Sequence, residues 1–135
     1  MDKKLIGLVF VFFLAFFLFI NIVVFNQPLS ILTRAKEDFL PSTEKSLIFA
    51  WPLTNKINNQ VTINVFVRNE KGLPLANKNV VLRSTLGDIF PNSATTDKSG
   101  KVTFNLVSAN SGIATVSAVV ENNYPLHQNV SIKFE

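Results

Sequence analysis

The chain has 135 residues, of which 47% are hydrophobic, so it is long enough for one ordinary domain with an attached segment and too apolar to be disordered. Its net charge is only +4, and the basic residues are scattered without interleaved aromatic platforms, which argues against nucleic-acid binding. The chain contains no cysteine, which excludes disulfides, thiol nucleophiles and cysteine metal sites.

The first predicted element is a helix of residues 5–25, which follows a short basic tail, residues 1–4. The helix contains no charged side chain, and Asn21 is its only polar one. Its 21 residues would span about 30 Å, which matches the hydrocarbon core of a bilayer. A helix that is apolar on every face would need a larger protein around it to be buried in water. We therefore expect a transmembrane helix in contact with the lipid bilayer.

A cleaved secretory signal peptide is the alternative for this segment, since Lys3 and Lys4 precede the apolar run. The run exceeds the about 7 to 15 apolar residues of a signal peptide, and residues 23–30 offer no small-x-small cleavage site, so we expect the helix to remain attached. Lys3 and Lys4 lie directly beside the run, whereas Arg34 is the nearest basic residue beyond it. The positive-inside rule then predicts a single-pass protein of the cytoplasmic membrane with its N-terminus inside.

Residues 26–44 connect this helix to the rest of the chain. Pro28 predicts a kink or an end of the first helix, because proline cannot donate the next backbone hydrogen bond. From Leu29 to Phe39 the apolar residues recur at roughly helical spacing, and Pro41 would end such a helix. The connector is either a short amphipathic juxtamembrane helix or an irregular linker.

From residue 45 onward the period of the apolar residues changes to two. Residues 60–68 place valine or isoleucine at every second position, which predicts a half-buried strand. Six or seven short strands without an intervening helix predict an all-β antiparallel sandwich in residues 45–135. The clearest other strands are expected in residues 46–51, 80–84, 101–107, 112–120 and 130–134.

Two stretches of this domain carry a recognisable pattern. They are residues 71–82, KGLPLANKNVVL, and residues 94–119, ATTDKSGKVTFNLVSANSGIATVSAV. Their order of turn residues and alternating strands resembles the group 1 bacterial immunoglobulin-like domain, the module of intimin and invasin stalks. The resemblance implies an immunoglobulin-like sandwich with an interaction or spacer role. The matching positions are Gly72, Pro74, Val80, Leu82, Thr95, Thr96, Asp97, Gly100, Leu106, Ser108, Gly112, Val116 and Ala118.

The chain departs from this family pattern in two ways. Asn77 stands where the family commonly has glycine, and asparagine tolerates a left-handed turn less often than glycine does. The family usually occurs as tandem arrays on an outer-membrane barrel, whereas this chain has one copy behind a single helix. The resemblance therefore does not carry over adhesion to any host receptor.

Catalysis, cofactors and metal sites are not expected. His127 is the only histidine, and no base, orienting acid or second metal ligand of suitable spacing lies near it in the sequence. The sequence has no phosphate-binding glycine loop, nucleophile elbow or paired catalytic carboxylates. We predict that the protein is not an enzyme. Structural roles in turns are predicted for Gly72, Pro74, Asp97, Gly100 and Gly112.

Binding is expected at apolar side chains on the outside of the sandwich. Trp51 and Tyr124 lie at predicted strand ends, and Phe66 faces away from the apolar stripe of its strand. These three are the candidate partner contacts, because exposed aromatic residues commonly anchor interfaces. An alternative for Phe66 is that it covers the flank of its own sheet. Unpaired edge strands offer a second route, by strand addition.

The sequence thus predicts a membrane-anchored, extracytoplasmic immunoglobulin-like module that acts in protein interaction, adhesion or as an accessory subunit of a cell-envelope assembly. Its partner is an envelope protein or a second copy, and an anionic cell-wall polymer is a weaker alternative. The alternative function is a pilin-like or archaellin-like filament subunit with the apolar helix in the fibre core. The layout fits such a subunit, but the sequence lacks the leader-processing Gly or Ala and the early Glu of bacterial pilins.

Overall fold

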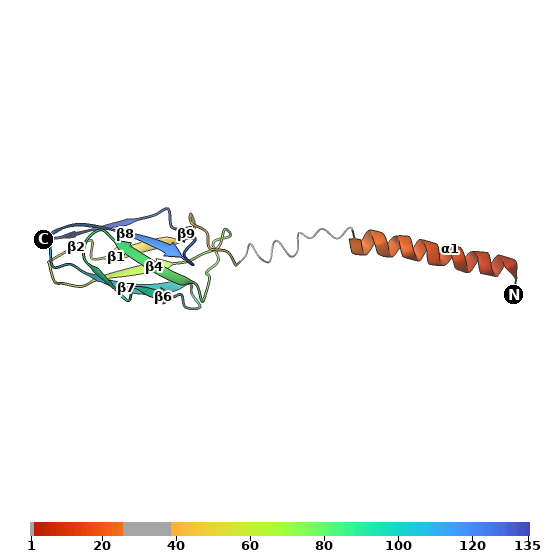
Figure 1. Cartoon of the computed structure of the whole chain (residues 1–135), viewed down its shortest axis with the longest axis horizontal. Coiled ribbons are helices and arrows are strands. Elements are labelled where there is room, and N and C mark those ends of the chain that lie inside the picture. The colour runs from red at the N-terminus through yellow and green to blue at the C-terminus, as the bar shows by residue number, and fades with distance from the viewer. Residues whose placement is uncertain (1, 26–38) are drawn as a thin grey trace. The chain divides into compact units, whose positions relative to one another are not determined.

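A computed structural model of the chain describes residues 2–25 and 39–135. The described residues form two separate compact units, an N-terminal helix and a β domain (Figure 1). The juxtamembrane helix predicted from residue 29 and the kink predicted at Pro28 lie outside the described residues.

The N-terminal unit is a single helix with a short π-helical end. Helix α1 spans Lys3–Ile20, and the π-helical turn η1 spans Asn21–Phe25. The backbone carbonyl of Asp2 accepts the N–H of Leu5 at 2.8 Å, which starts the helix. No side chain of α1 is buried. Within Lys3–Val23 an 18-residue window has a mean hydropathy of 2.9, so this segment is long and apolar enough to cross a bilayer.

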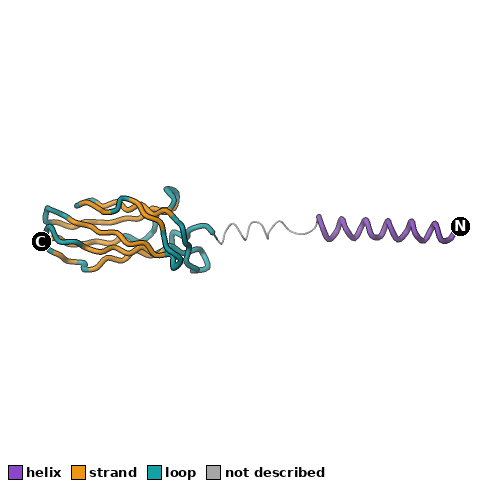
Figure 2. Tube along the Cα trace, turned by 90° about the horizontal axis from the view of Figure 1, so that it is seen from below, coloured by secondary structure: helices purple, strands orange, loops and turns teal. Residues whose placement is uncertain are grey.

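The β domain contains ten strands in two sheets packed face to face (Figures 1 and 2). One sheet has the order β1-β3-β7-β5, and the other has the order β2-β10-β8-β4-β6 with β9 paired to β8. The strands are β1 Leu47–Trp51, β2 Thr54–Asn55, β3 Val61–Phe66, β4 Asn79–Ser84, β5 Asp88–Phe90, β6 Ser93–Thr95, β7 Lys101–Val107, β8 Gly112–Val120, β9 Tyr124–Pro125 and β10 Val130–Phe134.

The core is formed by the inward-facing residues of the longer strands, in which buried and more exposed side chains alternate. In β3, β7 and β8 every second side chain is buried, because successive residues of a strand point to opposite faces of the sheet. Phe104 of β7 and Phe134 of β10 are the largest of the fully buried side chains. This pattern confirms the predicted sandwich and the inward faces of the predicted strands at residues 60–68, 101–107 and 112–120.

The structure adds four strands of two or three residues that the apolar pattern did not predict: β2, β5, β6 and β9. Strand β2 pairs with β10 in parallel, an exception to the otherwise antiparallel pairing of the described strands. The chain passes from β1 in one sheet to β2 in the other around Pro52, which follows a cis peptide bond. Such short strands exist because a neighbouring strand pairs with them.

The packed part of the domain begins before Lys45. Ser42 is 1% exposed, and its N–H donates to the carbonyl of Arg68 at 2.7 Å. The carbonyl of Thr43 accepts the N–H of His127 at 3.1 Å. The start of the domain and its C-terminus lie at opposite ends of the sandwich (Figure 1).

Candidate interaction surface

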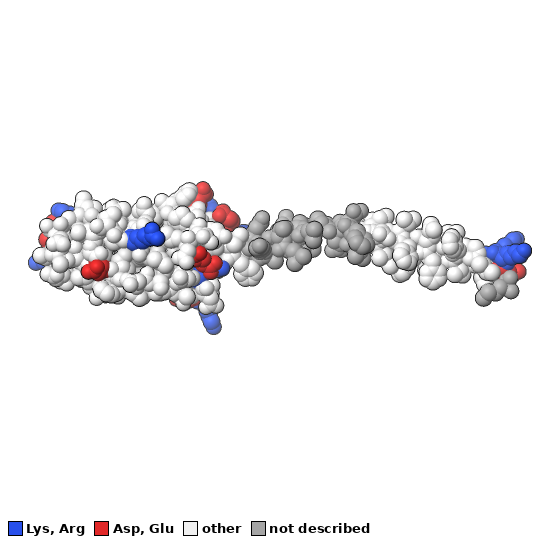
Figure 3. Space-filling model, viewed as in Figure 1, with Lys and Arg blue, Asp and Glu red and all other residues white. Residues whose placement is uncertain are grey.

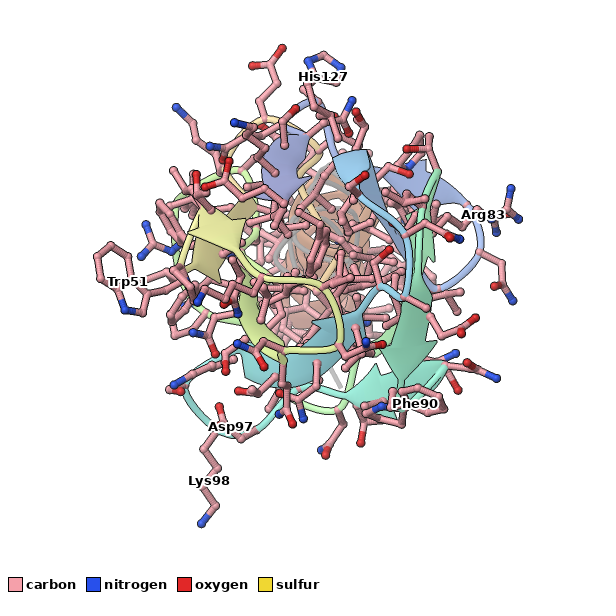
Figure 4. The ribbon with its side chains drawn as sticks, turned by 90° about the vertical axis from the view of Figure 1, so that its left-hand side faces the viewer. Trp51, Arg83, Phe90, Asp97, Lys98 and His127 are labelled. Carbon is pink, nitrogen blue, oxygen red and sulfur yellow. The ribbon has the colours of Figure 1, made fainter. Side chains whose placement is uncertain are left out.

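The outer face of strand β1 carries a row of apolar side chains, of which Leu47 is half-buried and Phe49 and Trp51 are exposed. Leu47, Phe49 and Trp51 alternate with the inward-facing Ile48 and Ala50, which follows from the two-residue repeat of a strand. Trp51 is 78% exposed and Phe49 is 48% exposed. In Figure 4 the Trp51 side chain projects outward from the edge of the domain.

Phe66 on the neighbouring strand extends this row. In the β1–β3 register Phe66 lies opposite Leu47, and Asn64 lies opposite Phe49. The rings of Phe49 and Phe66 meet edge to face, with their centroids 6.1 Å apart and their planes at 71°. This geometry is the favourable one for two aromatic rings, so the two side chains hold each other in place. We call Phe49, Trp51 and Phe66 the aromatic strip.

Phe49 and Trp51 of the aromatic strip lie on a free edge of the sheet, because β1 is the terminal strand of the order β1-β3-β7-β5. Phe66 is half-buried on the neighbouring strand β3. Residues 46–55 contain no charged side chain. The opposite edge strand, β5, has only three residues, contains Asp88 and is followed by Pro91. Short length, charge and proline are the usual protections of edge strands against other chains. Strand β1 is longer, with five residues, and carries no charge, although Pro52 follows it directly.

One side chain approaches the free backbone of β1. The N–H of Ile48 donates to Oε1 of Gln128, at a long distance of 3.5 Å. Gln128 itself is exposed. The contact occupies one backbone donor of the edge and leaves the outer face of the aromatic strip open.

The structure places two of the three predicted contact residues on one sheet, at opposite ends of the β1–β3 pairing, and the third on the other sheet. Trp51 and Phe66 lie on adjacent strands of one sheet. Tyr124 lies in β9, which belongs to the other sheet, and its side chain is half-buried against the core. Phe49 was missed by the sequence analysis. The signal for it was the alternation of residues 47, 49 and 51, which is visible once β1 is known to be an edge strand.

The turn at residues 97–100 is closed by Asp97. Its Oδ1 accepts hydrogen bonds from the Ser99 hydroxyl at 2.6 Å, the Ser99 N–H at 2.8 Å and the Lys101 N–H at 3.0 Å. These bonds, above all that from the Ser99 hydroxyl, hold the pKa of Asp97 below its ordinary value of 3.8. Asp97 and Lys98 lie at the surface of the domain (Figure 4). The geometry is that of a self-contained turn.

Gly100 and Gly72 both have positive φ. Gly100 has φ +72, and a Cβ on it would lie 2.5 Å from the carbonyl oxygen of Val67. That oxygen accepts the N–H of Leu75 at 2.9 Å, so a side chain at Gly100 would displace a bonded backbone. Gly72 has φ +79 and no close neighbour around a built Cβ, and its N–H donates to the carbonyl of Asn69 at 2.9 Å.

The other predicted turn positions lie beside strands. Pro74 forms an isolated antiparallel bridge with Arg68. Gly112 has φ +150 and begins β8, where a Cβ would meet Leu86 at 3.2 Å. Asn77 has φ +57, so it takes the left-handed conformation expected at this position.

Thr96, just before the turn at residues 97–100, is hydrogen-bonded to the backbone of the segment that precedes β4. The Thr96 hydroxyl donates to the carbonyl of Leu75 at 2.7 Å and accepts the N–H of Lys78 at 3.0 Å. Its side chain is 3% exposed. The sequence analysis gave this residue no role beyond the family pattern, because a threonine in a turn does not reveal which backbone it will meet.

No metal-binding cluster is visible in the described parts of the chain. Within residues 2–25 and 39–135, no three His, Cys, Asp or Glu side chains are grouped so as to hold an ion. His127 is exposed at the surface (Figure 4). Charged side chains are scattered over the face of the domain in Figure 3 and form no basic patch there.

Comparison with known proteins places these features in a family. The sequence profile of the bacterial Ig-like domain (group 1) family matches residues 57–135. The solved structure of the D0–D1 domain of intimin has a TM-score of 0.59 and 26% identity, over 65% of this chain and 46% of that one. No curated protein sequence matches the chain.

Two further solved structures belong to proteins named for their binding. A 282-residue intimin fragment in complex with the intimin-binding domain of the translocated intimin receptor has a TM-score of 0.57 and 25% identity, over 70% of this chain and 33% of that one. Invasin, titled a bacterial integrin-binding protein, has a TM-score of 0.56 and 26% identity, over 67% of this chain and 19% of that one. This chain therefore spans less than half the length of the intimin and invasin structures that it resembles.

Proposed function

Because the chain belongs to the bacterial Ig-like domain (group 1) family, we propose that it is a membrane-anchored protein-interaction module of the cell envelope. Helix α1 spans the cytoplasmic membrane with its basic end inside, and the sandwich lies outside. The module serves in adhesion or as an accessory subunit of an envelope assembly, and it catalyses no reaction.

A protein partner is supported by what the related domains bind. Intimin is seen in complex with a protein receptor domain, and invasin is named for binding integrin. This chain covers only a part of each of those proteins, so neither receptor is proposed as its partner. What we transfer is the class of partner, a folded protein.

The observation that carries the proposal is the aromatic strip, in which Phe49 and Trp51 lie on an uncharged edge strand. Exposed aromatic residues anchor protein interfaces because they bury a large area while few rotatable bonds become ordered. The pairing of Phe49 with Phe66 fixes part of the strip before any partner arrives. The absence of charge in residues 46–55 favours an apolar protein surface over an anionic polymer, which would need clustered lysine or arginine.

The membrane anchor is supported by the composition of α1. The helix has charged side chains only at its N-terminal end, and the rest of its described surface is uncharged (Figure 3). An 18-residue helix with no buried side chain exposes a large apolar surface to its surroundings. Lipid is the solvent in which that surface is stable, since the helix satisfies its own backbone hydrogen bonds.

A photo-crosslinking amino acid at selected positions tests the contact surface in intact cells with the full-length chain. We expect Trp51 to give one discrete adduct with an envelope protein, and the Phe49→Ala change to weaken that adduct. Phe90 and Ile113 are matched control positions, because they are exposed apolar residues on other strands, at 59% and 66% exposure. Equal adducts at all three positions, or none at Trp51, would contradict the proposed surface.

Cysteine labelling tests the anchor and its orientation, since the chain has no native cysteine. A membrane-impermeant thiol reagent should label Lys98→Cys in intact cells or spheroplasts and should leave Asp2→Cys unlabelled until the membrane is opened. The protein should also stay in the pellet after alkaline carbonate treatment. Release of the intact protein by carbonate, or labelling of Asp2→Cys from outside, would refute the anchored topology.

A further inference from the structure

One face of α1 and η1 differs from the rest of the helix in its side chains. Gly7, Phe10, Leu14, Phe17 and Asn21 follow one another at spacings of three, four, three and four residues. At about 100° per residue these five positions lie within an arc of roughly 80°. A repeat of 3.5 residues is the spacing with which two helices pack along each other. We call these five residues the seam.

The side chains of the seam leave a groove between them near the middle of the helix. Phe10, Leu14 and Phe17, together with the flanking Phe13, line a groove of about 380 Å³. On the opposite face the rings of Phe12 and Phe16 stack on each other, with centroids 6.3 Å apart. The side chains of the opposite face therefore pack against each other, whereas the groove along the seam can accept side chains of another helix.

Gly7 lies at the N-terminal end of the seam and has no role in the packing of its own chain. A Cβ built on Gly7 would meet no atom within 4 Å. Glycine is unfavourable inside a helix, so its presence needs another reason. Small residues on membrane helices allow the backbone of a neighbouring helix to come close.

Asn21 lies at the other end of the seam and carries an incompletely satisfied amide. Its Nδ2 donates to the carbonyl of Phe17 at 2.9 Å. Within the described residues, the second N–H and the Oδ1 of this amide have no partner. Polar groups without partners are unfavourable in lipid, and an amide supplies both the donor and the acceptor that another amide needs.

We infer that two copies of this chain associate as parallel helices through the seam, with Asn21 of each chain beside Asn21 of the other. The occupant is a second copy because a parallel copy brings Gly7 to Gly7 and one Asn21 amide to its complement at the same depth. All copies share one orientation, because Lys3 and Lys4 lie at the same end of each helix. The inference rests on the proposed membrane anchor.

Disulfide scanning of the full-length chain in phospholipid vesicles tests the seam. Single cysteines replace seam residues in Phe10→Cys, Leu14→Cys and Phe17→Cys, and Phe12→Cys and Phe16→Cys serve as matched controls on the opposite face. On mild oxidation we expect disulfide dimers at the three seam positions and at most a small fraction at the controls. Equal dimer formation on both faces would overturn the inference and would instead fit a fibre core in which every face is packed.

Two substitutions in the seam and one control off it, all outside the sandwich, provide a second test. Energy transfer between labelled full-length chains is followed as lipid is added. Asn21→Leu should weaken the association by about threefold, the average effect of one interhelical hydrogen bond in membranes. Gly7→Ile should weaken it further, whereas Ala15→Ile, a small-to-large change off the seam, should leave it unchanged. Equal effects of Gly7→Ile and Ala15→Ile would contradict the seam.

Carbonate extraction of the same samples distinguishes failure of the proposed membrane anchor from failure of the proposed helix dimer. If the protein is released from the membrane, the proposed anchor fails and the inference fails with it. If the protein is integral but shows no energy transfer at any lipid dilution, the anchor stands and the helix dimer is refuted. An integral protein with seam-specific disulfides supports both.

Discussion

Helix α1 and the sandwich use the same kinds of apolar residue with opposite results. None of the side chains of α1 is buried, although an 18-residue window of Lys3–Val23 has a mean hydropathy of 2.9. In β3 the apolar residues occupy alternate positions, and Val61, Ile63 and Val65 are fully buried. Apolar content alone therefore does not make a core. A chain buries side chains against itself only where their period matches the element, and a helix that is apolar on all sides requires lipid or other helices.

The comparison is tested most strongly by removing one phenylalanine from each region. Phe104→Ala should lower the free energy of unfolding of the sandwich by about 3 to 5 kcal/mol, because Phe104 is fully buried and its loss leaves a cavity. Phe13→Ala should leave that free energy unchanged, since Phe13 is 58% exposed in the helix. Urea unfolding of the full-length protein in detergent micelles, followed by circular dichroism of the β signal, measures both. Equal losses would contradict the separation of the two regions.

A pair of glycine substitutions gives the next effect in size. Gly100→Ala should destabilise the sandwich by about 1 to 3 kcal/mol, because alanine is strained at positive φ and its Cβ would collide with the carbonyl of Val67. Gly7→Ala adds a methyl group where nothing lies within 4 Å, and it should not lower the helix content. The same urea experiment measures the first variant, and the helical signal in micelles measures the second. If Gly100→Ala left the free energy of unfolding unchanged, the turn would be able to accommodate a Cβ at this position, contrary to our prediction.

Two threonines of the sandwich allow a finer comparison between buried and exposed contacts. Thr96→Val removes the hydroxyl that bonds Leu75 and Lys78, which leaves buried backbone groups unpaired and should cost about 1 to 3 kcal/mol. Thr103→Val removes an exposed bond to Asn64 and should cost clearly less. Chemical denaturation of both variants provides the measurement. A larger loss for Thr103→Val would contradict a stabilising role for the hydrogen bonds of the buried Thr96 hydroxyl.

The smallest effect is expected at the water-exposed turn of Asp97. Its pKa is lowered in the folded protein, so the charged carboxylate adds stability above the ordinary carboxyl pKa of 3.8, and this gain is lost as the pH falls through the lowered value. Asp97→Asn keeps an acceptor oxygen but cannot ionise. The native protein should thus be the more stable of the two near neutral pH, and the difference should shrink as the pH falls below 3.8. A difference that does not change with pH would rule out a role for the charge.

The sequence predicted strands correctly where the alternation of apolar and polar residues continues over six or more residues. The runs that became β3, β7 and β8 have six to nine residues, and their alternation showed which face would be inside. It missed β2 and β9, which have two residues each, because a pair of residues has no period and becomes a strand only beside β10 or β8.

Only part of the candidate interaction surface could be predicted from the sequence. An aromatic residue at a strand end was a reason to name both Trp51 and Tyr124, but burial differs between them because β9 lies against the core while β1 lies at a free edge. Phe49 gained its place from the β1–β3 pairing, which brings its ring to Phe66 across 17 residues of sequence, 66 minus 49.

The sequence by itself determined the division of the chain into an apolar helix and a β unit, because hydropathy and period are local properties. It also indicated the turn positions Gly72, Gly100 and Gly112 and the left-handed Asn77, since such requirements belong to single residues, but not Gly87 or Asn58, which have positive φ as well. The tertiary structure alone decided which strands form edges, which aromatic rings lie together and which backbone the Thr96 hydroxyl fastens. These features depend on contacts between segments far apart in the chain, and no local pattern specifies them.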